Sequence, residues 1–300
     1  MPTDTSPKDI AIKKPDWLRR RLPDSAAYHE MDEALLEERL HTVCVSAVCP
    51  NKWECFSRRT ATFLILGDVC TRACRFCGVA KGAPRPVDAD EPARIARAVA
   101  RFGLRYVVVT SVTRDDLANG GSAQFVGTIR AVRETVPGAK VEVLTPDFRN
   151  DREAIESVLR SGPAVFAHNV EMVPRLYAGM RGGLSSYRRS LDVLRYASEF
   201  APHIPVKSGL MAGLGESDDE VFAVMEDLRG AGVDILTIGQ YLQPEKNCVP
   251  VAKFVAPETF QYYHGRALGL GFRSVFAGPY VRSSYRAEEA LKKNDFGDKR

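Results

Sequence analysis

From residue 60 onward, short strand-like segments alternate with longer segments of helical pattern, and this alternation limits the folds open to the chain. The strand candidates are apolar runs at 62–66, 106–110, 141–144, 165–169, 206–211 and 235–239, with a seventh at 274–278. Repeated strand–helix units of this kind build a parallel sheet. Six or seven units cannot close an eightfold barrel, so we expect an α/β fold: an open, partial (β/α)₆ TIM-like barrel.

Helical segments separate these strands, and the clearest of them is "SDDEVFAVMEDLRGAG" at 217–232. Ser217 and Glu220 have the spacing of a capping box, and Gly230 suits the exit of a helix. The segment therefore predicts a well-capped helix between two strands of the barrel.

The length and composition are those of a globular protein that can bury a large core. The chain has 300 residues, of which 45% are hydrophobic and 27% are charged, and barrels of this size form single units. We expect the barrel to occupy 60–279, with an N-terminal extension at 1–59 and a C-terminal extension at 280–300.

The sequence also argues against some partners and locations. No apolar run approaches the roughly 18 residues that a membrane span needs, and the N-terminal stretch has acidic residues and prolines but no apolar core of a secretory signal. The net charge of +4 is too small for a dedicated nucleic-acid binder. We expect a cytoplasmic protein with no membrane and no nucleic-acid partner.

Seven cysteines are present, and six of them lie between residues 44 and 77. An odd number without an export signal disfavours a disulfide framework and favours metal ligation. The six form two groups of three: the N-terminal triplet (Cys44, Cys49, Cys55) and the loop triplet (Cys70, Cys74, Cys77). The seventh, Cys248, we expect to be a small buried hydrophobic residue.

The loop triplet directly follows the first predicted strand, at the face where barrels of this class build their active sites. Structural zinc takes four ligands, and neither a histidine nor a fourth cysteine lies at the usual spacing from these three. A 4Fe-4S cluster can be held by three thiolates, which leaves one iron open to a small molecule. We therefore expect an iron–sulfur cluster at this loop.

The C-x3-C-x2-C spacing, with Phe76 before the last cysteine, resembles the signature of the radical S-adenosylmethionine superfamily. In that superfamily the open iron binds S-adenosylmethionine, and an electron from the cluster cleaves it to a 5'-deoxyadenosyl radical. Within it, the chain resembles the lipoyl synthases from residue 14 to 285. The matching segments are both triplets with "KPDWLRRRLP", "TSVTRDDLANGG", "LTPDF", "HNVEMVPRLY", "KSGLMAGLGE", "LTIGQYLQP" and "GPYVRSSY".

This resemblance implies insertion of two sulfur atoms at carbons six and eight of an octanoyl group carried on a protein lysine. A radical is needed because an alkyl C–H bond has no acidity for a general base to use. The resemblance also implies a second 4Fe-4S cluster, held by the N-terminal triplet and Ser284 and consumed as the sulfur donor, with Ser283 the less favoured ligand. The implied partners are octanoylated H protein, acyltransferase subunits of 2-oxoacid dehydrogenases, an electron donor and an iron–sulfur carrier.

The same resemblance suggests residues that contact S-adenosylmethionine, although no side chain is expected to be catalytic. Asn169 and Glu171 would lie near its ribose and methionyl group, or would form a buried polar pair that satisfies loop amides. Gly213 would let adenine approach the backbone, or would simply serve a tight turn. The remaining candidates for this contact are Phe76, Ser111 and Arg114. Apart from the resemblance, Lys207 could meet either a carboxylate or the cluster region.

Two other classes of function stay open at this point. One is another radical enzyme with a second cluster, such as biotin synthase or an RNA methylthio-transferring enzyme. The other is a zinc-binding interaction module without enzymatic activity.

Overall fold

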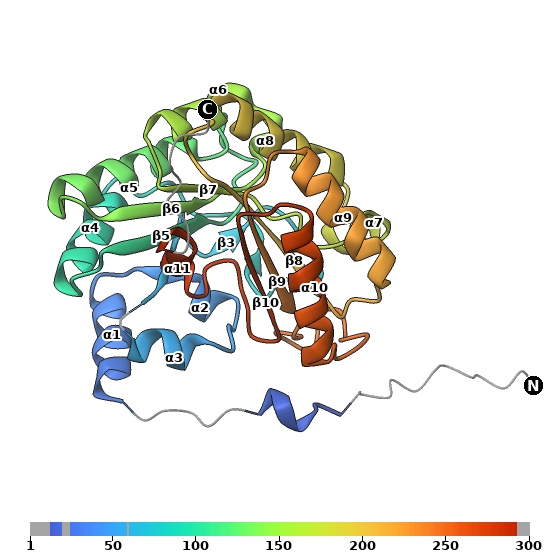
Figure 1. Ribbon diagram of the computed structural model, residues 1–300. Coiled ribbons are helices and arrows are strands. Elements are labelled where there is room, and N and C mark those ends of the chain that lie inside the picture. The colour runs from blue at the N-terminus through green and yellow to red at the C-terminus, as the bar shows by residue number, and fades with distance from the viewer. Residues whose placement is uncertain (1–12, 20–24, 59, 293–300) are drawn as a thin grey trace, which may run out of the picture.

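An eight-stranded sheet forms the centre of the computed structural model, which describes residues 13–19, 25–58 and 60–292 (Figure 1). The strand order is β1-β2-β5-β6-β7-β8-β9-β10; β1 is antiparallel to β2, and all other neighbours are parallel. The strands are β1 (His41–Thr42), β2 (Thr62–Ile65), β5 (Tyr106–Ser111), β6 (Lys140–Leu144), β7 (Val165–Ala167), β8 (Val206–Ala212), β9 (Ile235–Gln240) and β10 (Ser274–Gly278).

The seven predicted strands are all present, each within two residues of its expected bounds. They curl into an open arc with helices on its outer side, as Figure 1 shows, so the expected partial barrel is confirmed. The helices of the described chain are α1 (Ala26–Glu37), α2 (Val43–Ser46), α3 (Lys52–Ser57), α4 (Glu91–Arg101), α5 (Ser122–Thr135), α6 (Arg152–Arg160), α7 (Pro174–Arg181), α8 (Tyr187–Phe200), α9 (Asp218–Gly230), α10 (Pro257–Gly269) and α11 (Ala287–Lys292), with 3-10 turns at Asp16–Leu18 and Phe148–Asn150.

Helix α9 has the predicted capping box, with both reciprocal bonds between Ser217 and Glu220 formed. It ends at Gly230, and the left-handed turn comes two residues later, at Gly232, where φ is +80°. None of the described helices is both long and apolar enough to cross a bilayer.

The strands are buried on both faces, as parallel strands under helices must be. The outward face of β5 carries Val107 and Val109, which pack into the main hydrophobic core. The inward faces are partly polar: the Lys207 ammonium donates to Glu142 at 2.8 Å, and the Tyr106 hydroxyl donates to the same carboxylate at 2.5 Å. Of the two alternatives for Lys207, the carboxylate is therefore the one found.

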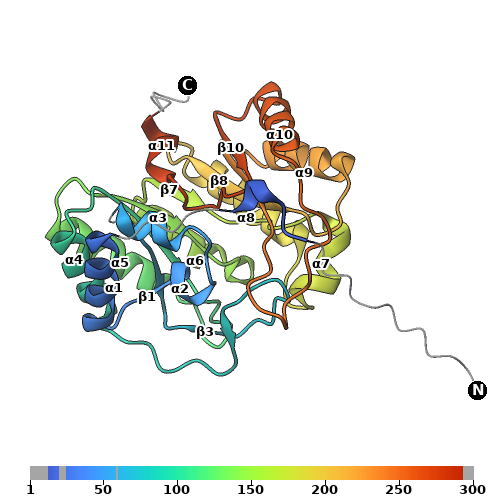
Figure 2. The same ribbon diagram turned by 90° about the horizontal axis from the view of Figure 1, so that it is seen from below.

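The open side of the barrel is covered by parts of both extensions. Helices α1 to α3 lie beside β1 and β2 (Figure 1). Helix α11 lies close to β7 and β10 in Figure 2, and its Ala290 packs against Val165 of β7 and Ile235 of β9. The Tyr28 ring stacks on Trp53 with a centroid distance of 4.0 Å, which joins α1 to α3. Residues 1–12, 20–24, 59 and 293–300, which all belong to the two predicted extensions, lie outside the described residues.

Candidate functional site

The loop triplet lies where β2 leaves the sheet. The chain turns at Leu66 (φ +69°) and Gly67 (φ +88°), and the Glu91 carboxylate accepts a hydrogen bond from the Leu66 amide at 2.9 Å. Two short strands, β3 (Val69–Cys70) and β4 (Ala80–Lys81), then pair in parallel and enclose the cysteine loop. The three thiols therefore lie at the carboxyl face of the barrel, as predicted.

These thiols are unpaired and close to one another. Burial raises the pKa of the Cys77 thiol to about 12, and nearby Cys74 and Cys70 raise it further. The pKa of Cys74 is also raised, by burial first and then by Cys70 against the opposing charge of Arg181. A bound metal would favour the thiolate form of these buried groups, since a metal deprotonates its thiol ligands.

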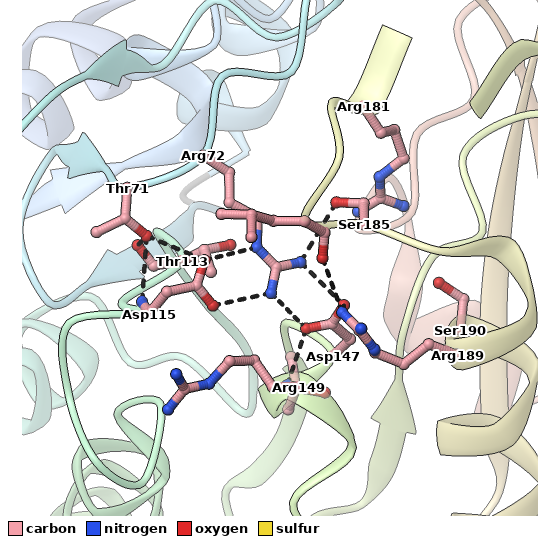
Figure 3. A network of polar contacts seen from close by, with 12 residues as sticks. Thr71, Arg72, Thr113, Asp115, Asp147, Arg149, Arg181, Ser185, Arg189 and Ser190 are labelled. Carbon is pink, nitrogen blue, oxygen red and sulfur yellow. Dashed lines mark hydrogen bonds and ion pairs between the residues drawn. The ribbon is translucent and has the colours of Figure 1, made fainter. Parts of the chain in front are cut away.

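Arg72, between the first two cysteines of the loop triplet, ties the loop to the barrel (Figure 3). Its guanidinium is 5% exposed and forks onto two carboxylates: Asp115 after β5, at 2.8 and 2.9 Å, and Asp147 after β6, at 2.9 and 2.6 Å. Asp147 also accepts from Arg189 on α8 at 3.4 Å. The paired charges lower the pKa of Asp147 despite its burial, and the loop is fixed to two strand ends at once.

The segment after β9 also holds the cysteine loop in place, together with α7. The Val249 amide, after β9, donates to the Arg75 carbonyl at 3.0 Å, and the Arg75 amide donates to the carbonyl of Met180 on α7 at 2.7 Å. Cys248 is buried, as predicted, and its sulfur lies 3.6 Å from the Cys77 carbonyl oxygen. The loop triplet is thus held between the β5 and β6 ends on one side and this segment on the other.

The N-terminal triplet lies on α2, α3 and the turn between them. Burial raises the pKa of Cys44 to about 12 and that of Cys55 to about 11, and Cys49 raises both further. The charge of Arg282 acts on Cys49 in the opposite direction. Three thiols from one short stretch therefore face one another beside the C-terminal segment.

The C-terminal segment, residues 279–286, is held against the N-terminal triplet. The Asn51 side-chain amide donates to the Tyr280 carbonyl at 2.7 Å, and the Tyr285 hydroxyl donates to Glu54 at 2.8 Å. Ser283 donates from its hydroxyl to Asn169 Oδ1 at 2.8 Å. No hydrogen bond of the Ser284 hydroxyl to the described part of the chain is found, which leaves this oxygen available as a ligand.

One cavity of about 650 Å³ joins the two groups of cysteines. Its size lies within the roughly 300–1,000 Å³ that small-molecule sites occupy. The residues that line it include Cys44, Cys49, Cys55, Phe76, Cys77, Asn169, Glu171, Met211, Ser283 and Ser284. The cavity is therefore lined by the whole N-terminal triplet and by Cys77 of the loop triplet.

Asn169 and Glu171, which the sequence places two residues apart, meet at the cavity wall. The Asn169 amide donates to Glu171 at 3.2 Å, and burial raises the pKa of Glu171. Glu171 has φ +68° and hydrogen-bonds along β8 through both its amide and its carbonyl. Such strain in a residue with a side chain is typical of functional sites.

The other predicted S-adenosylmethionine contacts differ in their surroundings. The Ser111 hydroxyl is buried at the end of β5 and lacks a hydrogen-bond partner among the described residues. Arg114 instead forks onto Asp116 at 2.9 and 2.8 Å. Gly213 has φ +98°, and a Cβ there would lie 2.2 Å from Gln240 Nε2, so packing and turn geometry explain this glycine. Ser111 is thus the one of these three with an unused polar atom.

Sequence reasoning missed the residues that position the site. Arg72, Asp147, Asn51 and Glu54 each bond to a residue far away in sequence. A charged residue shortly after a strand, such as Asp147 three residues after β6, could have indicated them, because the carboxyl ends of parallel strands meet at one face.

The donor set fits iron–sulfur clusters. Among the described residues, no three His, Cys, Asp or Glu side chains are compact enough to hold a single metal ion. The fit rests on the donors themselves: two sets of three soft thiols, mutually close and free of disulfides, which is the ligand chemistry of such clusters.

Comparisons with solved structures describe the fold. The chain is similar to methylornithine synthase, with a TM-score of 0.54 and 14% identity over 90% of this chain and 88% of that one. It is also similar to the hydrogenase maturase HydG, with a TM-score of 0.55 and 14% identity over 90% of this chain and 67% of that one. These matches support the barrel architecture alone.

Sequence comparisons identify the family. The model of the Radical SAM superfamily matches residues 64–239. Lipoyl synthases from Rubrobacter xylanophilus and Thermus thermophilus are 52% and 51% identical, covering 92% and 95% of this chain and 86% and 88% of theirs. The Pseudomonas aeruginosa lipoyl synthase is 47% identical over 99% of this chain and 91% of its own. These matches set aside the biotin synthase-like and zinc-module alternatives, and the chain belongs to the lipoyl synthase family of the radical S-adenosylmethionine superfamily.

Proposed function

We propose that this chain inserts sulfur at carbons six and eight of an octanoyl group attached to a lysine of a lipoyl carrier protein. The observation that carries this proposal is one cavity lined by all three cysteines of the N-terminal triplet and by Cys77 of the loop triplet. Two separate sites would let a radical form, but they would not bring sulfur to the carbon that the radical activates. A shared cavity supports a reaction in which both groups act on one chain.

The loop triplet would hold the cluster that binds S-adenosylmethionine, and the N-terminal triplet with Ser284 would hold the second cluster. When bound, the first would supply a radical that removes a hydrogen atom from an alkyl carbon, and the second would supply sulfide. Arg72 would keep the loop triplet fixed relative to the strand ends, and so preserve the separation between the two clusters. Such fixed placement is the protein's contribution to cofactor chemistry.

The walls of the cavity suit an acyl chain. Val108, Leu144, Leu210 and Met211 line it, and Phe76 packs against the apolar cluster that includes Tyr241. Apolar walls would bind the octanoyl group and would keep solvent and dissolved thiols, whose weak S–H bonds quench carbon radicals, away from the reacting carbon. We also propose that Ser111, Asn169 and Glu171 contact S-adenosylmethionine, because each presents a buried or half-buried polar group at the carboxyl ends of the strands.

The partners follow from this reaction. We propose octanoylated H protein and the acyltransferase subunits of 2-oxoacid dehydrogenases as carriers, with an electron donor and an iron–sulfur carrier that rebuilds the second cluster. We propose a cytoplasmic location, because seven free thiols suit a reducing compartment. The division into 1–59, 60–279 and 280–300 is also proposed.

The test is anaerobic turnover of a peptide that contains octanoyl-lysine, followed by mass spectrometry. Dethiobiotin serves as the matched control, since a biotin synthase-like enzyme would convert it. We expect the peptide to gain two sulfur atoms and dethiobiotin to stay unchanged. Conversion of dethiobiotin, or an unaltered peptide despite cleavage of S-adenosylmethionine, would contradict the proposal.

A further inference from the structure

The C-terminal segment fits into places where strands carry no side chain. Gly239 lies on β9, and a Cβ there would lie 2.0 Å from the Val281 carbonyl oxygen. Gly209 lies on β8, and a Cβ there would lie 2.6 Å from Ser283 Oγ and 2.8 Å from Asn169 Oδ1. Glycine within a strand often marks close approach of another backbone. Neither glycine has a positive φ, so space rather than backbone conformation accounts for both.

Two neighbouring residues of this segment, Ser283 and Ser284, line different parts of the cavity. Ser283 donates to Asn169, which in turn donates to Glu171 at the wall near the loop triplet. Ser284 lines the same cavity as the N-terminal triplet. One hydrogen bond therefore fixes the segment directly before the residue that we assign as a ligand.

We propose that Ser283 is a positioning residue: its bond to Asn169, in the space that Gly209 leaves, sets the position from which Ser284 meets the second cluster. This inference rests on the proposed function, because it assumes that the N-terminal triplet and Ser284 hold that cluster. Ser283 would act only through Ser284, so its contribution should disappear when Ser284 is absent. That dependence separates positioning from direct ligation.

The experiment measures how fast an iron chelator removes iron from the second cluster in the anaerobic holoprotein, without turnover. The variants are Ser283→Ala, Ser284→Ala and the double variant. Ser157→Ala on α6, where the hydroxyl bonds only within its own helix at 2.8 Å, is the control for serine removal. Ser283→Thr, which keeps the hydroxyl, tests rescue.

Loss of the bond in Ser283→Ala should speed iron loss about 2- to 10-fold, the range expected for one hydrogen bond. Ser284→Ala should speed iron loss more than Ser283→Ala does. The double variant should lose iron as fast as Ser284→Ala, because Ser283 acts only through Ser284. Ser157→Ala should behave as the unchanged protein, and Ser283→Thr should restore slow loss.

Three outcomes would overturn the role of Ser283. The first is a double variant whose rate of iron loss is the product of the two single effects, and the second is an unchanged rate in Ser283→Ala. The third is fast iron loss in Ser283→Ala with slow iron loss in Ser284→Ala, which would make Ser283 the ligand. The iron content of the unchanged protein is read first. Iron for one cluster only would refute the proposed function itself, whereas iron for two clusters with any of these outcomes would refute only the inference about Ser283.

Discussion

Replacing Arg72 with Ala should destabilise the chain strongly, because it leaves a buried carboxylate without its main partner. Asp147 is 2% exposed and would keep only the Arg149 amide at 3.0 Å and Arg189 at 3.4 Å. Breaking a buried ion pair on one side costs about 3–5 kcal/mol. Because these two contacts remain and Asp115 reaches solvent, we expect the lower end, about 3 kcal/mol.

The assay is denaturant unfolding of the cluster-free chain under reducing conditions, so that cluster loss does not contribute. The midpoint should fall at an unchanged slope, which marks a change in stability rather than in exposed surface. Arg72→Lys should lie between, since lysine keeps the charge but cannot fork onto two carboxylates. Arg101→Ala, which breaks the exposed pair with Glu37 at 2.7 Å, is the control and should leave the midpoint unchanged.

A second substitution tests the cause. Adding Asp147→Asn to Arg72→Ala removes the uncompensated charge, so it should recover part of the lost stability. The reasoning would be refuted if Arg72→Ala unfolds at the midpoint of the unchanged chain, or if Asp147→Asn makes the Arg72→Ala variant still less stable.

Four further predictions concern the clusters and one buried histidine. Changing any cysteine of the loop triplet to Ala should abolish cleavage of S-adenosylmethionine while the iron of the second cluster remains; continued production of 5'-deoxyadenosine would exclude these ligands. Changing a cysteine of the N-terminal triplet should do the reverse, and a thiolated product from such a variant would mean another sulfur source. We expect the iron bound to Ser284 to detach when the second cluster gives up its sulfur. Ser284→Cys should therefore retain the cluster but slow sulfur transfer, because thiolate holds iron more firmly than a hydroxyl oxygen does; full product yield would argue against detachment of that iron. Burial lowers the pKa of His168 to about 4, so the unfolded chain binds an extra proton between about pH 6.5 and 4. The cluster-free chain should therefore lose roughly 3 kcal/mol of stability as the pH falls through that window. His168→Gln should flatten this dependence, and an equal slope in both proteins would contradict the lowered pKa of His168.

The barrel could be predicted because its signals are local. Each parallel strand is an apolar run of a few residues between turn signals, so all seven strands could be located from sequence. Strands β1, β3 and β4 have two residues each, which is too short for any periodicity. The pairing of β3 with β4 depends on the loop that they enclose, and β1 pairs with the longer strand β2.

The site could be predicted only in part, for a related reason. Cysteine spacing is local, but the partners of Arg72 lie 43 and 75 residues away. The contact between Ser283 and Asn169 spans 114 residues and needs the missing side chain of Gly209. Sequence spacing cannot distinguish Ser283 from Ser284, whereas this contact gives them different surroundings.

The central claim is that both triplets serve one cavity in which the second cluster gives its sulfur to the octanoyl chain. The most direct test is a single turnover of enzyme whose clusters carry a heavy sulfur isotope, with octanoyl-lysine peptide and light sulfide in the buffer. Mass spectrometry should find two heavy sulfur atoms in each product molecule. Light sulfur in the product, or heavy sulfur transferred equally well after a cysteine of the N-terminal triplet is replaced, would contradict the account.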